Sequence, residues 1–159
     1  MSVSVPYYCE NKHKTTFNLL SGKIIGVDPR EESDIVQYSN VPDNLKEIIR
    51  EAYICKAEKA SKAGMLMVRL MLDGLLWELG FQDRYVGDKV IKFEQKCNSD
   101  SSFKQQHKTI WSKIDVFRTI SKLAGYHAHA QPDFFSVQQS EFETYLYIVE
   151  GAIKDKWPK

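Results

Sequence analysis

The side chains best suited to chemistry stand near the end of the chain. Arg118, Lys122, Gly125 and His129 are spaced four, three and four residues apart, so they share one face of any helix that continues through the glycine. An imidazole near neutral pKa can move protons, and fixed cations can stabilise an anionic phosphorane. We therefore take His129, Lys122 and Arg118 as candidate catalytic residues.

The same stretch has a purely structural interpretation. His127 would point away from this face, unless Gly125 breaks the helix and both histidines approach one site. A partly buried histidine at a helix end, hydrogen-bonded to backbone carbonyls, would show the same spacing without any chemistry. Both interpretations stay open at this point.

Metal chemistry has little support in the sequence. The two histidines stand two residues apart, a spacing that suits a strand better than a helix, and no third ligand is obvious nearby. Cys9 and His13 are half of a zinc knuckle without a second half. We expect no metal and no cofactor.

A second polar group lies on an otherwise apolar helical segment. Arg69 and Asp73 stand four residues apart, so their side chains can meet, and Lys62 lies on the same side. An unpaired buried charge costs roughly several kcal/mol, so these groups must pair or face a cavity. They are either a structural ion pair or one wall of a polar cleft. We take Arg69, Asp73 and His127 as candidate binding residues.

The elements that must position these residues are mostly helical. Pro42 and Asp43 mark a helix start, and the segment that carries Arg69 is apolar almost all round, as expected for the centre of a bundle. Apolar periodicity predicts helices over about 43–60, 62–79, 88–97, 103–123 and 137–156, with a loop at 98–102.

The first 40 residues have a different pattern. Thr15–Leu20 and Lys23–Val27 are short runs separated by Ser21-Gly22, which predicts a tight hairpin. The sequence thus predicts a mainly α protein, with a four- to five-helix bundle over 41–159 and a small N-terminal β-hairpin with its connector over 1–40.

Composition narrows the class of protein. The 159 residues carry a formal net charge of +1, so a nucleic-acid contact would need a local basic patch. Three cysteines at wide spacings form no disulfide framework, and no signal peptide is evident. The longest apolar stretch contains Arg69 and Asp73, so it does not suit a membrane span. We expect a cytoplasmic protein without membrane contact.

Several short motifs, in order, resemble domain-of-unknown-function family 4145, a member of the HEPN-like helical bundles. The resemblance covers about residues 41–157. It rests on Val41-Pro42, Glu51-Ala52, Ala60-Ser61-Lys62-Ala63, Arg69-Leu70-Met71-Leu72-Asp73 and Lys122-Leu123-Ala124-Gly125-Tyr126-His127-Ala128-His129.

This resemblance implies a function. In active HEPN ribonucleases an arginine and a histidine meet across a homodimer and cleave RNA without metal. Here His129 matches the histidine and Lys122 occupies the arginine position, which loses the bidentate fork suited to phosphate. In addition, Gly125-Tyr126 replaces the family's Gly-Asn pair.

We therefore expect a non-catalytic HEPN-like interaction or dimerisation module of a bacterial or phage defence-related system. Its expected partners are a second copy, RNA or a defence protein. The alternative is a metal-independent endoribonuclease, a toxin-like effector that uses His129 with Lys122 and Arg118. A third hypothesis is an accessory domain that binds a small anion between Arg69 and His129.

Overall fold

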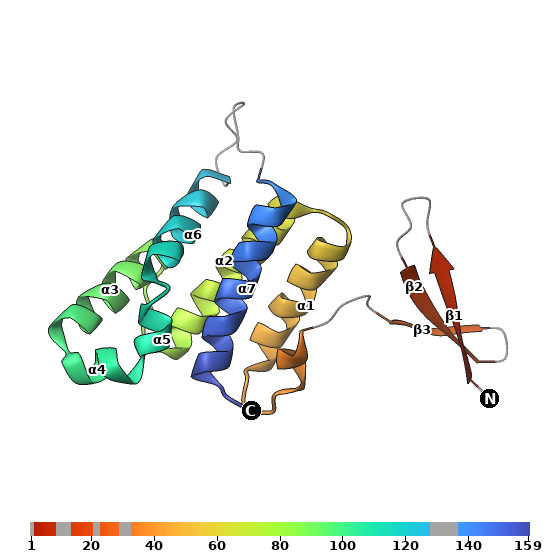
Figure 1. Cartoon of the computed structure of the whole chain (residues 1–159), viewed down its shortest axis with the longest axis horizontal. Helices are drawn as coiled ribbons and strands as arrows, with labels where there is room; N and C mark the ends of the chain where they lie inside the picture. Colours follow the sequence, from red (N-terminus) through yellow and green to blue (C-terminus); the bar gives the residue numbers. More distant parts are fainter. Residues whose placement is uncertain (1, 9–13, 21–22, 29–32, 128–136) are drawn as a thin grey trace. The chain divides into compact units, whose positions relative to one another are not determined.

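The chain divides into two compact units, residues 1–32 and 33–159, in the computed structural model (Figure 1). The structure describes the backbone of residues 2–8, 14–20, 23–28, 33–127 and 137–159. Side chains are described for residues 33–123 and 137–159. His129 therefore lies outside the described residues, and His127 is described by its backbone alone.

The N-terminal unit contains three antiparallel strands in the order β1-β2-β3. β1 spans Ser2–Tyr8, β2 spans Lys14–Leu20 and β3 spans Lys23–Asp28. The pairing of β2 with β3 shifts register between Asn18 and Leu19. The sequence analysis expects a hairpin over the residues of β2 and β3 and no strand at β1, and the hairpin stays a prediction.

The second unit is a helical bundle, so the described chain is mainly α. α2 lies at its centre, because it packs against α1, α3, α6 and α7 (Figure 1). The elements are a 3-10 helix η1 (Asp34–Gln37), followed by α1 (Asp43–Ala57), α2 (Ser61–Glu78), α3 (Val86–Ser99), α4 (Ser101–Gln106), α5 (Lys108–Trp111), α6 (Ile114–His127) and α7 (Gln139–Lys156).

One predicted helix is broken into three. Instead of a single helix over 103–123, the chain forms α4, α5 and α6, and the predicted loop at 98–102 is reduced to Asp100. The Asp100 carboxylate accepts a hydrogen bond from the Phe103 backbone N–H at 3.0 Å and starts α4. Phe103 then packs edge-on against Phe81 and Phe93. This packing holds α4 against the end of α3, and the chain turns again at His107.

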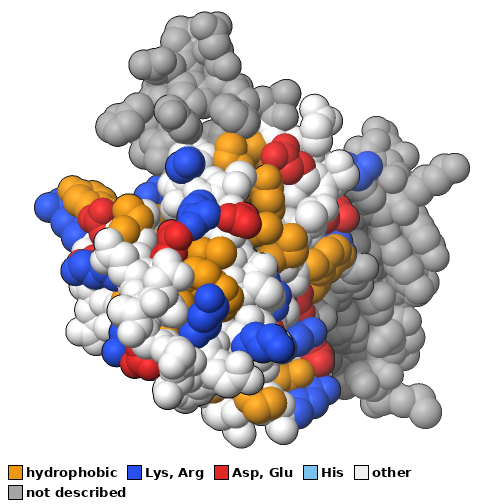
Figure 2. All heavy atoms as spheres, turned by 60° about the vertical axis from the view of Figure 1, so that its left-hand side comes forward, with side chains coloured by type: hydrophobic (Ala, Val, Ile, Leu, Met, Phe, Trp, Pro, Cys, Tyr) orange, Lys and Arg blue, Asp and Glu red, His pale blue; other side chains and the backbone are white. Residues whose placement is uncertain are grey.

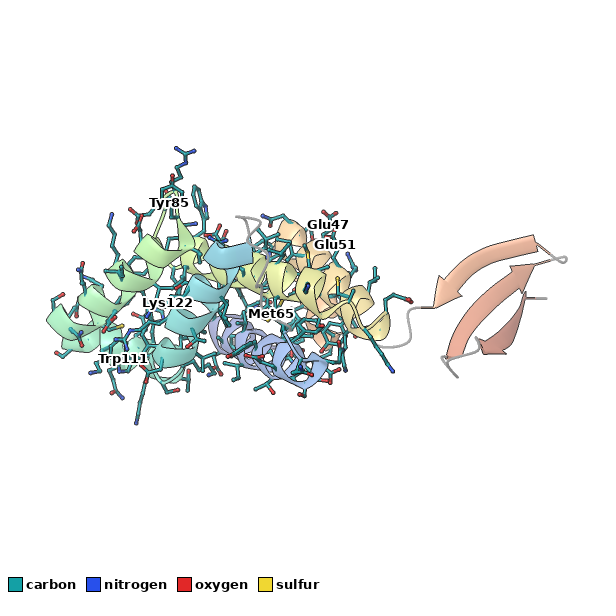
Figure 3. All side chains as sticks on the ribbon, turned by 90° about the horizontal axis from the view of Figure 1, so that it is seen from above. Glu47, Glu51, Met65, Tyr85, Trp111 and Lys122 are labelled. Carbon is teal, nitrogen blue, oxygen red and sulfur yellow. The ribbon has the colours of Figure 1, made fainter. Side chains whose placement is uncertain are left out.

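The core depends on close packing between α2 and α7. Gly64 in α2 faces the Phe142 ring of α7, and a Cβ atom on Gly64 would lie 2.3 Å from the ring. Met65, which Figure 3 shows among the helices, is fully buried beside it. Glycine at position 64 therefore permits the approach of α7 to α2.

A buried carboxylate attaches the start of the unit to the bundle. Ser33 donates a hydrogen bond to Glu150 Oε1 at 2.7 Å, and the Tyr53 hydroxyl donates to Glu150 Oε2 at 2.6 Å. Lys154 Nζ lies 3.0 Å from the same carboxylate and 2.8 Å from Asp34. Residues 33–40, which the sequence analysis assigns to the connector, therefore belong to the helical unit.

Replacement of Gly64 by alanine tests the close packing. We expect Gly64→Ala to lower the free energy of unfolding by about 1–3 kcal/mol, because the Phe142 ring has to move. The matched control is Gly87→Ala in α3, where a Cβ would meet nothing within 4 Å and which should leave stability unchanged or slightly raised. Urea denaturation measures both. Equal effects of the two substitutions would contradict the assignment.

The pKa of Asp34 predicts a pH dependence of stability. Hydrogen bonds, the strongest from Lys154 and others from Lys159 and Tyr38, lower the pKa of this carboxyl from 3.8 to about 2. A lowered folded-state pKa stabilises the fold above the unfolded-state value, and that stabilisation is lost as pH falls from about 4 through 2. Unfolding midpoints measured across this window should fall more steeply for wild type than for Asp34→Asn. Parallel curves for the two proteins would refute this pairing.

Candidate functional site

Asp73 in α2 contacts a buried lysine of the neighbouring helix. Lys89 Nζ in α3 lies 2.9 Å from Asp73 Oδ1, and its side chain is only 2% exposed, whereas that of Asp73 is 36% exposed. The same ammonium lies 4.9 Å from the centroid of the Trp77 ring. The sequence analysis considered a contact of Asp73 with Arg69 and did not identify Lys89. The sequence pattern could have indicated this buried lysine, because Lys89 is the single cation on the apolar stripe formed by Val86, Val90, Phe93 and Cys97.

Two hollows adjoin on the outward side of α2, and both are lined by Leu70 and Asp73. The first, about 390 Å³, has Arg69 and Arg84 at its rim and is here called the cationic hollow. Its other lining residues are Leu66, Met67, Tyr85 and Val86. The second, about 240 Å³, has Asp73 and Glu78 at its rim and is called the acidic hollow. It is completed by Pro42, Asn44, Leu45, Ile48, Gly74 and Trp77.

Large apolar side chains remain exposed around these hollows. On α2, Leu66 is 40% exposed, Leu70 44% and Trp77 47%, and Tyr85 just before α3 is 57% exposed. Figure 3 shows Tyr85 at the outer edge of the unit, on the same side of the view as Glu47 and Glu51 of α1. An all-apolar helix predicts complete burial, but α1, α3, α6 and α7 leave this face of α2 uncovered within the described residues.

Arg118, a predicted catalytic residue, is held by two carboxylates. Its Nε lies 3.1 Å from Glu94 Oε2, its Nη2 contacts Glu94 Oε1, and its Nη1 lies 2.6 Å from Asp115 Oδ1. The hydrogen bond with Glu94 raises the pKa of the guanidinium, so Arg118 remains charged. Its charge joins α6 to α3. A phosphate would have to compete with both carboxylates for it.

Lys122, labelled in Figure 3, lies one turn further along α6, and its side chain is exposed. Among the described side chains it makes no hydrogen bond or ion pair. α6 continues to His127, so the helix passes through Gly125 as the shared-face prediction requires. The relation of Lys122 to His129 stays a prediction.

The surface shown in Figure 2 carries no broad field of one sign. Lysine and arginine side chains alternate there with aspartate and glutamate, and hydrophobic side chains lie between them. Such alternation offers no continuous basic track for a nucleic-acid backbone on that face.

Neither described cysteine is activated as a nucleophile. Burial raises the pKa of the Cys55 and Cys97 thiols, which keeps both protonated and poorly nucleophilic. No group of three histidine, cysteine, aspartate or glutamate side chains there gathers in a way that would hold a metal ion. Nor does any described helix have the length and apolar character needed to cross a bilayer.

Comparisons of the chain with models of known protein families, with curated proteins and with solved structures found no match.

Two substitutions separate the roles of Asp73 and Lys89. We expect Asp73→Asn to lower the free energy of unfolding by about 1–3 kcal/mol, because the buried ammonium loses its counter-charge. Lys89→Met should stay within about 1 kcal/mol of wild type, since the partly exposed Asp73 remains hydrated. Urea denaturation of both variants checks this order. If Lys89→Met lowered the free energy of unfolding more than Asp73→Asn, the cost of an unpaired buried ammonium would not explain the role of this pair.

Proposed function

We propose that this chain is a non-catalytic HEPN-like interaction and dimerisation module of a bacterial or phage defence-related system. It docks through the outward face of α2. The observation that carries the proposal is the group of exposed apolar side chains, Leu66, Leu70, Trp77 and Tyr85, around two adjoining hollows. Clusters of exposed apolar side chains rimmed by charge are typical of protein–protein contacts.

The state of Arg118 supports a non-catalytic role. A phosphate-binding arginine has to offer its planar donors to the substrate, whereas the Arg118 donors already bind Glu94 and Asp115. Lys122 supplies a charge without the bidentate fork. The HEPN assignment itself rests on the ordered motifs of the sequence and on the mainly helical fold.

One observation keeps the ribonuclease alternative worth testing. Lys122 is exposed on α6, two turns before the histidine-containing end of the stretch, and a phosphate could reach it. In that alternative, His129 moves the proton and Lys122 neutralises the phosphate.

An RNA cleavage assay decides between the two. Purified wild type and His129→Ala are incubated with structured and single-stranded RNA in the presence of EDTA. We expect the two proteins to leave the RNA equally intact, because the cationic partner of the histidine lacks arginine geometry. Cleavage by wild type that disappears in His129→Ala would overturn the non-catalytic proposal and establish the alternative.

A further inference from the structure

The outward face of α2 carries opposite charges on its two sides. Arg69 and Arg84 rim one hollow, Glu78 rims the other, and Leu70 lies between them because it lines both. We propose that a second copy of this chain covers this face, with the cationic hollow of each copy opposite the acidic hollow of the other. The inference rests on the proposed docking role of α2 and names its occupant.

Symmetry makes such a face able to bind itself. In a two-fold dimer the same patch serves both subunits, and a feature on one side of the axis meets the feature on the other side. An axis that passes between the hollows, near Leu70 and Asp73, brings each cationic hollow onto an acidic one. Two equivalent sets of opposite charges then face each other.

One charge at each rim is available for such contacts. Arg84 and Glu78 are both exposed, and within the described residues neither makes an ion pair. Arg84 lies beside the Tyr85 ring, with its guanidinium carbon 5.3 Å from the ring centroid. Glu47 and Glu51 of α1 add negative charge on the same outer side of the unit (Figure 3).

The apolar side chains supply the reason for association. Leu66, Leu70 and Trp77 lie along one line of α2 at helical spacing, and each is at least 40% exposed. Burying them against a copy removes apolar surface from water on both subunits. The surrounding charges, partly desolvated by the contact, then select the antiparallel orientation over one that places like charges together.

Other occupants fit the face less well. A nucleic-acid backbone would be repelled by Asp73 and Glu78, which share the surface with the arginines. A small anion in the cationic hollow would leave Trp77 and the acidic hollow uncovered. A second copy covers both hollows and the exposed apolar side chains between them.

A charge-swap experiment with the full chain tests the proposal. Two variants are made, Arg84→Glu and Glu78→Arg, and sedimentation velocity is measured for each alone and for their equimolar mixture. Alone, each variant places like charges opposite each other twice per dimer, and we expect self-association to weaken by about tenfold or more. In the mixture every contact again joins opposite charges, so dimers should reform.

Two controls distinguish a loss of docking from misfolding and from non-specific hydrophobic association. Both substituted positions are exposed, so circular dichroism should match wild type, and so should thermal unfolding at protein concentrations low enough for wild type to be monomeric. Leu70→Ser should also weaken self-association, whereas Ile91→Ser removes a slightly more exposed side chain from α3 and should not.

The outcomes separate this inference from the proposed function. Dimers that reform only in the mixture support it. A monomeric wild type at about 100 μM, far above the nanomolar to micromolar range of specific contacts, would overturn it together with the proposed dimerisation. Dimers that persist in both single variants would overturn this pairing of the hollows and leave the proposed dimerisation in place. The RNA assay tests the non-catalytic role independently.

Discussion

The burial of the inner face of α2 is the constraint on which the helical unit depends. α1, α3, α6 and α7 all pack against this helix, and its residues Met65, Val68, Met71, Leu72, Leu75 and Leu76 are fully buried. Gly64 lets the Phe142 ring approach the α2 backbone, which settles how closely α7 can lie. Because four helices take their positions from one, a change in the inner face of α2 affects contacts throughout the bundle.

Two polar contacts help to determine the register of the helices, which apolar burial alone does not fix. The Lys89–Asp73 pair joins α3 to α2, and the Glu150 carboxylate joins η1, α1 and α7 through Ser33 and Tyr53. Apolar surfaces are non-directional, whereas a buried charge is tolerated only where its partner stands at the correct position. Both contacts therefore favour one register of the helices over neighbouring ones.

The packing of the helices gives some charged residues a structural role and leaves others exposed at the surface. Arg118, whose type and position suggested phosphate chemistry, is engaged by Glu94 and Asp115 and ties α6 to α3. Asp73 pairs with a buried lysine and at the same time lines two exposed hollows. A chain with a net charge of only +1 can thus present local fields of both signs. Such fields favour a partner that carries both signs in reverse, as proposed for a second copy.

Periodicity in the sequence was sufficient for the helical class, for α1, α2 and α7, and for the central place of α2. These follow from local patterns, since a 3.6-residue apolar repeat buries only as a helix. The break of the predicted helix 103–123 was not visible, because it depends on Phe103 meeting Phe81 and Phe93. In the candidate site, residue types and spacing singled out Arg69, Asp73, Arg118 and Lys122.

Only the tertiary structure decided what these side chains contact. Glu94 lies 24 residues before Arg118, and Lys89 lies 16 residues after Asp73, on a different helix in each case. The sequence did not reveal the exposed face of α2 either. A helix that is apolar all round is predicted to be fully buried, and this pattern does not show how many helices pack against it. Sequence periodicity determines which sides of a helix avoid water. Which sides are actually covered depends on how many other helices the chain can bring there.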